Sequence, residues 1–146
     1  MKAISLLQPW AELVVCGAKQ WETRSWSTKY RGTLLIHASQ KFTKQQRELC
    51  LQEPFRSAIN LPLSFGVIIG MVDLRGVIQT DKIKNELSET ETSFGDYSMG
   101  RFAWKLQEPH RFAVMMPAEG SLGLWNYDGW AFKESETNLW NLVPKR

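Results

Sequence analysis

The sequence predicts an α+β fold, in which short helices pack around a small β-barrel. Two observations support this prediction: short apolar segments rich in β-branched residues recur along the chain, and glycines interrupt the longest of them, where a barrel strand must bend. The 146 residues can bury one core without disulfides or metal, and 43% of them are hydrophobic. We therefore expect one domain over residues 1–146.

A strand and a helix open the chain. Residues 3–7 are apolar and lead to Pro9, whose fixed φ suits the start of a helix. In the helix expected over residues 9–16, apolar side chains recur at the spacing of one helical face: Trp10, Leu13 and Val14. Gly17 follows, and glycine readily adopts the left-handed backbone that ends helices.

The next segment alternates like a strand. If residues 20–25 are extended, Glu22 and Arg24 lie on one face, while Trp21 and Thr23 point to the other. This strand would present an anion and a cation side by side.

The middle of the chain holds a buried strand, a helix and a long strand. Residues 33–38 predict a largely buried strand because apolar and β-branched residues run almost unbroken. A helix follows to about residue 52, with Ser39 or Thr43 as its N-terminal cap. Residues 65–78 are too rich in valine, isoleucine and glycine for a helix, so we expect one long strand that bends near its glycines.

The last third begins with a polar segment, residues 80–97, in which we expect a short helix over residues 82–87. This segment either covers a cleft as a lid or lies elsewhere. Two strands follow, over residues 102–106 and 112–115, and a turn at residues 108–110 joins them, because a proline stands there.

The chain carries no signal for a membrane, a metal or a cofactor. Its longest apolar run, residues 65–74, is too short to span a bilayer, and the first fifteen residues lack the apolar core of a signal peptide. We therefore expect a cytoplasmic protein, with Cys16 and Cys50 as free thiols. Neither His37 nor His110 has a second ligand at metal-site spacing, so we predict no metal and no cofactor.

Basic residues gather in the N-terminal third. The net charge is +3, which suits an anionic partner without requiring one. The basic residues that concentrate there include Lys19, Arg24, Lys29, Arg31, Lys41, Lys44 and Arg47. A solvated face would have the same composition.

Five ordered segments resemble the ASCH (activating signal cointegrator homology) domain family: SLLQPWAELVVCGAKQWETRSW, YRGTLLIHAS, GVIIGMVDL, GRFAWKL and GLW. The first is the most specific, through Gln8, Pro9, Trp10, Gly17, Lys19, Glu22, Arg24 and Trp26. The resemblance covers about residues 3–126. It implies a PUA-like fold with a cleft that receives polar side chains from the first helix and the following strand, and a role in binding nucleic acid.

The cleft implied by this resemblance defines a candidate ligand site. Arg24 offers a planar fork of donors, Lys19 offers a point charge, and Glu22 accepts hydrogen bonds from a base edge or an amide. The full predicted set is Gln8, Trp10, Lys19, Glu22, Arg24, Trp26, His37 and Ser39, with Trp26 as the first choice for a stacking wall. The alternative for Glu22 and Arg24 is an exposed ion pair worth about 0–1 kcal/mol. For His37, a structural hydrogen-bonded histidine is the alternative to a catalytic base.

These features favour a module that binds RNA or a nucleotide-like ligand in a basic cleft. A hydrolase is the alternative, either an amidohydrolase of an acylated nucleoside such as N4-acetylcytidine or a single-strand ribonuclease. Related small hydrolases have a lysine that matches Lys19, but Glu22 stands at the position of their threonine nucleophile. In such a hydrolase, Glu22 would act as a general base on water while Lys19 stabilises the oxyanion. Alternatively, a hydroxyl of Ser5 or Ser39 would enter the cleft from a neighbouring strand. A protein-interaction module is the third alternative, and the sequence indicates no oligomeric state.

Overall fold

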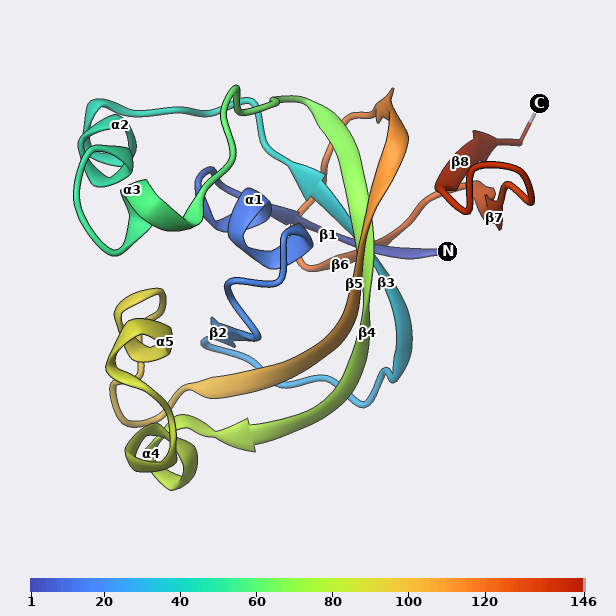
Figure 1. Cartoon of the computed structure of the whole chain (residues 1–146). Helices are drawn as coiled ribbons and strands as arrows, with labels where there is room; N and C mark the ends of the chain where they lie inside the picture. Colours follow the sequence, from blue (N-terminus) through green and yellow to red (C-terminus); the bar gives the residue numbers. More distant parts are fainter. Residues whose placement is uncertain (146) are drawn as a thin grey trace.

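The computed structural model describes residues 1–145 and shows a strongly curved sheet with helices on its concave side (Figure 1). The strands are β1 (Lys2–Leu6), β2 (Trp21–Arg24), β3 (Gly32–Ala38), β4 (Val67–Gln79), β5 (Phe102–Pro117), β6 (Leu124–Asn126), β7 (Gly129–Lys133) and β8 (Trp140–Pro144). The helices are α1 (Trp10–Val15), α2 (Lys44–Cys50), α3 (Phe55–Ala58), α4 (Thr80–Ile83) and α5 (Glu89–Ser93), with a 3₁₀ turn, η1 (Lys84–Glu86). The α+β prediction is confirmed.

The sheet differs from the predicted barrel in one respect. Its strands follow the order β6-β1-β3-β4-β5-β8-β7, and β2 pairs with β5 outside this path. Within residues 1–145 no ladder joins β6 to β7, so the curved sheet stays open. The short β6 and the β7–β8 hairpin occupy its two ends (Figure 1).

The first helix lies in the concavity of the sheet and fills the core. Leu13 and Val14 are buried, and Val14 packs with residues of β1, β3 and β4, including Ile4, Ile36 and Val72. Gly17 has φ +85°, so it ends the helix in the left-handed conformation that the sequence predicts. This turn directs the chain into β2, along the edge of β5.

The long strand β4 bends as expected. Its pairing shifts register between Ile68 and Gly70, between Met71 and Asp73, and between Leu74 and Gly76. At the first two shifts the extra residues lie on β5, and at the third Arg75 is the extra residue of β4. Extra residues bend a strand and increase its twist. The bends let β4 and β5 curve around α1 (Figure 1).

The predicted turn at residues 108–110 is wrong. β5 continues from Phe102 to Pro117, and Gln107 and His110 pair with Asp73 and Met71 of β4. Two residues on β5 therefore face one residue on β4, and Glu108, with φ +51°, takes the left-handed conformation at this bulge. A bulge accommodates Pro109, which has no N–H for the ladder.

Thr43, and not Ser39, caps the second helix. Its hydroxyl accepts from the backbone N–H of Gln46, and the Gln46 side chain accepts from the backbone N–H of Thr43. The sequence did not predict the short helix α3, which begins just after Pro54. In the 80–97 segment, the predicted helix over residues 82–87 is replaced by α4, η1 and α5.

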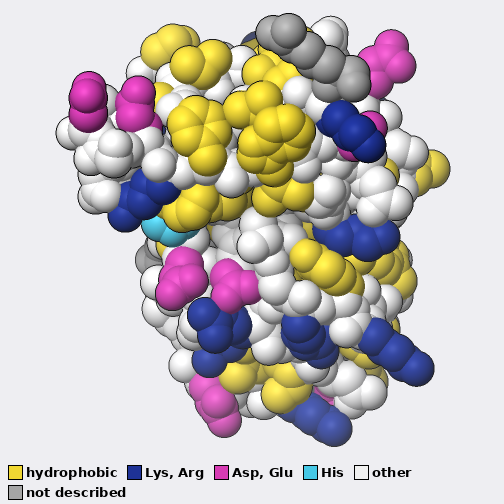
Figure 2. Space-filling model, turned by 90° about the vertical axis from the view of Figure 1, so that its right-hand side faces the viewer, with side chains coloured by type: hydrophobic (Ala, Val, Ile, Leu, Met, Phe, Trp, Pro, Cys, Tyr) yellow, Lys and Arg dark blue, Asp and Glu magenta, His cyan; other side chains and the backbone are white. Residues whose placement is uncertain are grey.

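The β7–β8 hairpin joins the sheet through one ladder pair, between Phe112 of β5 and Trp140 of β8. Leu142 is buried with Phe112, whereas the hairpin also leaves Trp130, Phe132 and Leu139 exposed. Figure 2 shows apolar side chains gathered on this face.

Cys16 and Cys50 are free thiols, as predicted. Within residues 1–145, no helix is long and apolar enough to cross a membrane. The cytoplasmic location stays a prediction.

Candidate functional site

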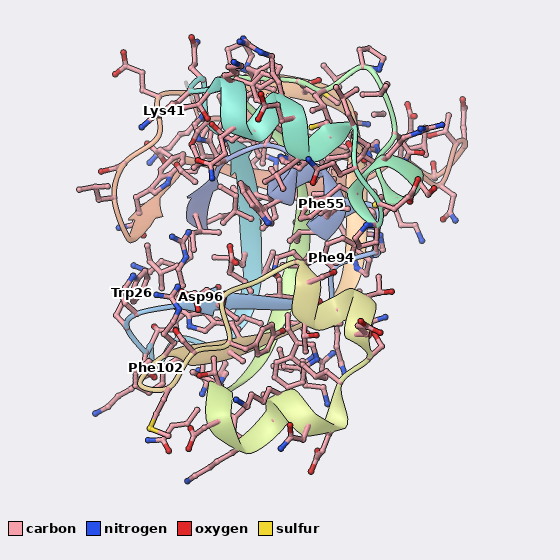
Figure 3. All side chains as sticks on the ribbon, turned by 90° about the vertical axis from the view of Figure 1, so that its left-hand side faces the viewer. Trp26, Lys41, Phe55, Phe94, Asp96 and Phe102 are labelled. Carbon is pink, nitrogen blue, oxygen red and sulfur yellow. The ribbon has the colours of Figure 1, made fainter. Side chains whose placement is uncertain are left out.

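Two hollows meet to form one groove on the face shown in Figure 3. The inner hollow, of about 420 Å³, is lined by residues that include Trp10, Glu22, Arg24, Phe55, Phe94 and Asp96. The outer hollow, of about 740 Å³, is lined by residues that include His37, Ser39, Lys41, Glu119, Gly120 and Leu122. Ser5, Leu7 and Arg24 line both. A ligand that enters one hollow can therefore extend into the other past Arg24.

Glu22 and Arg24 lie together on β2, on one face of the strand as the alternation predicts. Arg24 Nε lies 3.9 Å from Glu22 Oε2, and Arg24 Nη2 donates to the backbone oxygen of Ser5 at 3.2 Å. The Arg24 side chain is 28% exposed, and its buried Nε has no hydrogen-bond acceptor among the described residues. Because Nε is buried, the donors that remain for a ligand are those of the terminal nitrogens, one of which already binds Ser5.

Lys19 lies behind this floor and not in the groove. Its side chain is 1% exposed, its ammonium donates to the backbone oxygen of Trp21, and Nζ lies 3.5 Å from Glu22 Oε1. Glu22 Oε1 also accepts from the backbone N–H of Thr23 at 2.9 Å. Lys19 therefore acts on the groove through Glu22, whose charge it compensates from below.

The sequence reasoning missed Glu91 and Tyr97, which complete this buried cluster. Glu91 Oε1 accepts from the backbone N–H of Gln20 at 2.7 Å. Burial raises the pKa of Glu91, while the Gln20 hydrogen bond and the Lys19 charge oppose the rise. Burial, with the charges of Glu91 and Glu22, also raises the pKa of Tyr97. One signal was available: residues 87, 91 and 94 have the spacing of one helical face, and two of them are apolar.

The 80–97 segment forms a fixed wall of the inner hollow. Phe94 is 1% exposed and packs against Phe55, with ring centroids 5.2 Å apart. Thr23 Oγ1 accepts from the backbone N–H of Asp96 at 3.0 Å, which attaches the wall to β2. Hydrogen bonds from Ser98 lower the pKa of Asp96. In Figure 3, Phe55 and Phe94 lie near each other and Asp96 lies nearer Trp26.

His37 fastens the loop that walls the outer hollow. Its Nε2 lies 2.8 Å from the backbone oxygen of Ala118, and because a carbonyl oxygen only accepts, Nε2 carries the proton. Nδ1 therefore accepts from Ser5 Oγ at 2.9 Å, and Ser5 Oγ accepts from Trp125 Nε1 at 3.1 Å. Burial lowers the pKa of His37, which favours the neutral ring that this hydrogen-bond pattern requires.

Three residues of the predicted set do not line the groove. Gln8 is fully buried, where its Oε1 accepts from the backbone N–H of Glu12 and fixes the start of α1. Trp26 packs edge-to-face on Trp104, with ring centroids 4.8 Å apart. Lys19 is the third. The structure brings together the other five: Trp10, Glu22, Arg24, His37 and Ser39.

Charges of both signs line the groove, in contrast to the predicted basic cleft. Arg24 and Lys41 are the cations among the described lining residues. The carboxylates are those of Glu22, Asp96 and Glu119. The other basic residues of the N-terminal third line neither hollow. No group of three His, Cys, Asp or Glu side chains within residues 1–145 has the arrangement of a metal site.

The family model of the ASCH domain matches residues 4–136. The chain belongs to the ASCH domain family. It is 30% identical to activating signal cointegrator 1 of Homo sapiens and 29% identical to that of Mus musculus, in each case over 131 residues and 86% of this chain. The match spans 22% of the length of these two relatives.

Solved structures show the same ASCH fold. The crystal structure of ASCH from Zymomonas mobilis superposes with a TM-score of 0.54 at 14% identity, over 85% of each chain. Crystal structures of two mutants of that protein give 0.53. At this identity the likeness establishes the fold alone.

Proposed function

We propose that this ASCH domain binds RNA or a nucleotide-like ligand, with one nucleobase in the inner hollow. The observation that carries the proposal is the floor of that hollow, where Glu22 and Arg24 lie side by side beneath an aromatic wall. Such a floor offers an acceptor and several donors side by side, which suits the mixed edge of a base.

The aromatic wall supplies the apolar part of recognition. Trp10 is half-buried at the hollow and packs edge-to-face on Phe55, with centroids 6.2 Å apart. A base stacked on an aromatic side chain gains about 1–3 kcal/mol. The volume of about 420 Å³ lies within the usual range for small-ligand pockets.

The proposal limits the role of charge. Arg24 and Lys41 are the cations of the described groove lining, so a bound single strand makes at most two phosphate contacts there. The slope of log affinity against log salt should then be no steeper than about −1.4. Hydrogen bonds and stacking carry the rest of the affinity.

The test is the affinity of the whole chain for short single-stranded RNA, measured by fluorescence anisotropy. Glu22→Gln keeps the size of the side chain but turns one acceptor into a donor, so affinity should fall about tenfold, the effect of one lost charged hydrogen bond. Glu86→Gln is the matched control because Glu86 is exposed and lies outside both hollows. Equal affinities for the two variants would contradict the proposal.

A hydrolase is the second candidate, and the buried cluster favours it. Lys19, Glu22 and Glu91 place one cation against two carboxylates below the hollow, and the pKa of Glu91 is raised. Perturbed groups of this kind recur at catalytic sites. Glu22 would activate water against an acylated nucleoside, or against a phosphodiester, while Lys19 holds Glu22 in place.

Turnover separates the two candidates. The whole chain is incubated with N4-acetylcytidine and, separately, with single-stranded RNA, in the presence of a chelator. A hydrolase should form product with the wild type and lose it in Glu22→Gln. Binding without any product would favour the binding module over the hydrolase. Product formed equally by the wild type and by Glu22→Gln would show that Glu22 is not catalytic.

We also propose that residues 1–146 act as one unit. The family match ends at residue 136, within the C-terminal hairpin, yet β8 pairs with β5 at Trp140 and buries Leu142 against Phe112. Limited proteolysis should therefore leave β8 attached to the rest of the domain, whereas early loss of the hairpin would contradict this unit.

A further inference from the structure

The outer hollow is the larger of the two, at about 740 Å³, and the proposed function assigns no base to it. We propose that it is the subsite for a second nucleotide, so that the groove holds two consecutive nucleotides whose linking phosphate lies at Arg24. This inference rests on the proposed function, because it assumes a base in the inner hollow.

Arg24 stands where the linking phosphate would pass. It lines both hollows, together with Ser5 and Leu7 at their junction. A guanidinium has five N–H donors, and Nη2 uses one of them on the backbone oxygen of Ser5. That bond fixes the orientation of the group, whose side chain is 28% exposed, while Nε itself is buried beside Glu22 and stays out of reach of a ligand. Oriented donors of this kind match the oxygens of a phosphate.

The wall of the outer hollow is built before any ligand arrives. Residues 118–123 form it, and His37 holds them at Ala118 through the Nε2 hydrogen bond of 2.8 Å. Gly120 packs so closely that a Cβ there would collide with Ser5 Oγ and lie 2.7 Å from the His37 ring. A wall held in this way needs no ordering on binding, which removes one cost of association.

The chemistry of the outer hollow differs from that of the inner one. No Trp, Tyr or Phe lines it among the described residues, and its polar groups include the Ser39 hydroxyl, the Lys41 ammonium and the Glu119 carboxylate. These groups can bind a sugar hydroxyl and a second phosphate but provide no stacking platform. The inner position should therefore select the base, while the outer position accepts any base.

A comparison of ligands of one and two nucleotides tests the inference. The four 5′-mononucleotides and the four 5′-phosphorylated homodinucleotides are titrated into the whole chain by calorimetry. The dinucleotide with the preferred base should bind about tenfold more tightly than its mononucleotide, since the second unit binds at a high effective concentration. A third nucleotide should add little.

The Lys41→Gln variant tests whether the gain in affinity from the second nucleotide arises in the outer hollow. Lys41 is exposed, so its substitution leaves the core intact, and the affinity for the dinucleotide should fall about fivefold while that for the mononucleotide stays unchanged. Lys44→Gln is the matched control, because Lys44 is 83% exposed beside Glu48 and lies outside both hollows.

The outcomes separate this inference from the proposed function. Equal affinities for mononucleotide and dinucleotide, with no effect of Lys41→Gln, would overturn the second subsite and leave a mononucleotide site. No binding of either ligand, or of longer RNA, would overturn both. A gain in affinity that Lys44→Gln removes as strongly as Lys41→Gln would place the second nucleotide elsewhere and overturn the inference.

Discussion

The two hollows of the groove are built from different parts of the fold. The inner one is walled by core side chains, with Phe94 1% exposed and Phe55 6% exposed. The outer one is walled by a surface loop in which Leu122 is 97% exposed. The inner hollow cannot change shape without repacking the core, whereas the outer hollow depends on a few contacts at Ala118 and Gly120. We therefore expect the inner hollow to keep a fixed preference for one base, and the outer hollow to adapt to ligands of different length.

The largest effect should come from the inner wall. Phe94→Ala removes a buried aromatic that packs with Leu13, Phe55 and Ile59, so the free energy of unfolding should fall by about 3–5 kcal/mol. Denaturant unfolding measures the change. Leu122→Ala in the outer wall should stay within about 0.5 kcal/mol of the wild type, since its side chain is exposed. Equal losses of stability in Phe94→Ala and Leu122→Ala would contradict the proposed difference between the two walls.

An intermediate effect should come from Gly120→Ala. The added methyl group would collide with Ser5 Oγ and crowd His37, which forces residues 118–123 outward. Overpacking of this kind costs about 1–3 kcal/mol. The same measurement on Gly76→Ala gives the control, because a Cβ at Gly76 meets nothing within 4 Å.

Ligand binding sharpens the result for Gly120→Ala. The displaced loop should weaken the binding of a dinucleotide and leave that of a mononucleotide unchanged. If the affinities for the mononucleotide and the dinucleotide fell together, the two hollows would form one structural unit and would not be built independently.

The smallest effect should appear as a pH dependence. Burial lowers the pKa of His37 below its ordinary 6.5, so the unfolded chain takes up the proton first as the pH falls. The contribution of His37 to the free energy of unfolding therefore declines below about pH 6.5 and levels off below its folded-state pKa. His37→Gln can keep a donor to the Ala118 oxygen but does not titrate. As the pH falls from about 7.5 to about 5, the wild type should therefore lose stability relative to the variant. A constant difference would show that His37 titrates alike in both states.

The floor of the inner hollow could be predicted because its cause is local. Alternation along an extended segment places Glu22 and Arg24 on one face, and the glycine at position 17 ends the preceding helix. Two of the three register shifts of β4 likewise end at glycines, Gly70 and Gly76, where the sequence predicts bends.

The rest of the groove arises from contacts distant in the sequence. Lys19 is buried in a cluster with Glu22 and Glu91, and no local pattern shows that Gln20 binds Glu91, 71 positions away. The loop at residues 118–123 likewise lies beside His37 through a bond spanning 81 positions. Glu108 and Pro109 were read as a turn because composition alone does not distinguish a turn from a bulge in a paired strand.

Thr23 gives the floor of the inner hollow a further property. It stands between Glu22 and Arg24, and its hydroxyl fastens Asp96, so neighbouring positions of β2 serve the ligand and the wall in alternation. A shift of one residue along β5 would exchange these positions, because strand side chains alternate with a period of two. An insertion or deletion of one residue between Gly17 and Trp21 would therefore disable ligand recognition and release the wall together. The length of this connection is therefore constrained, as is the identity of Lys19 within it, which compensates the charge of Glu22.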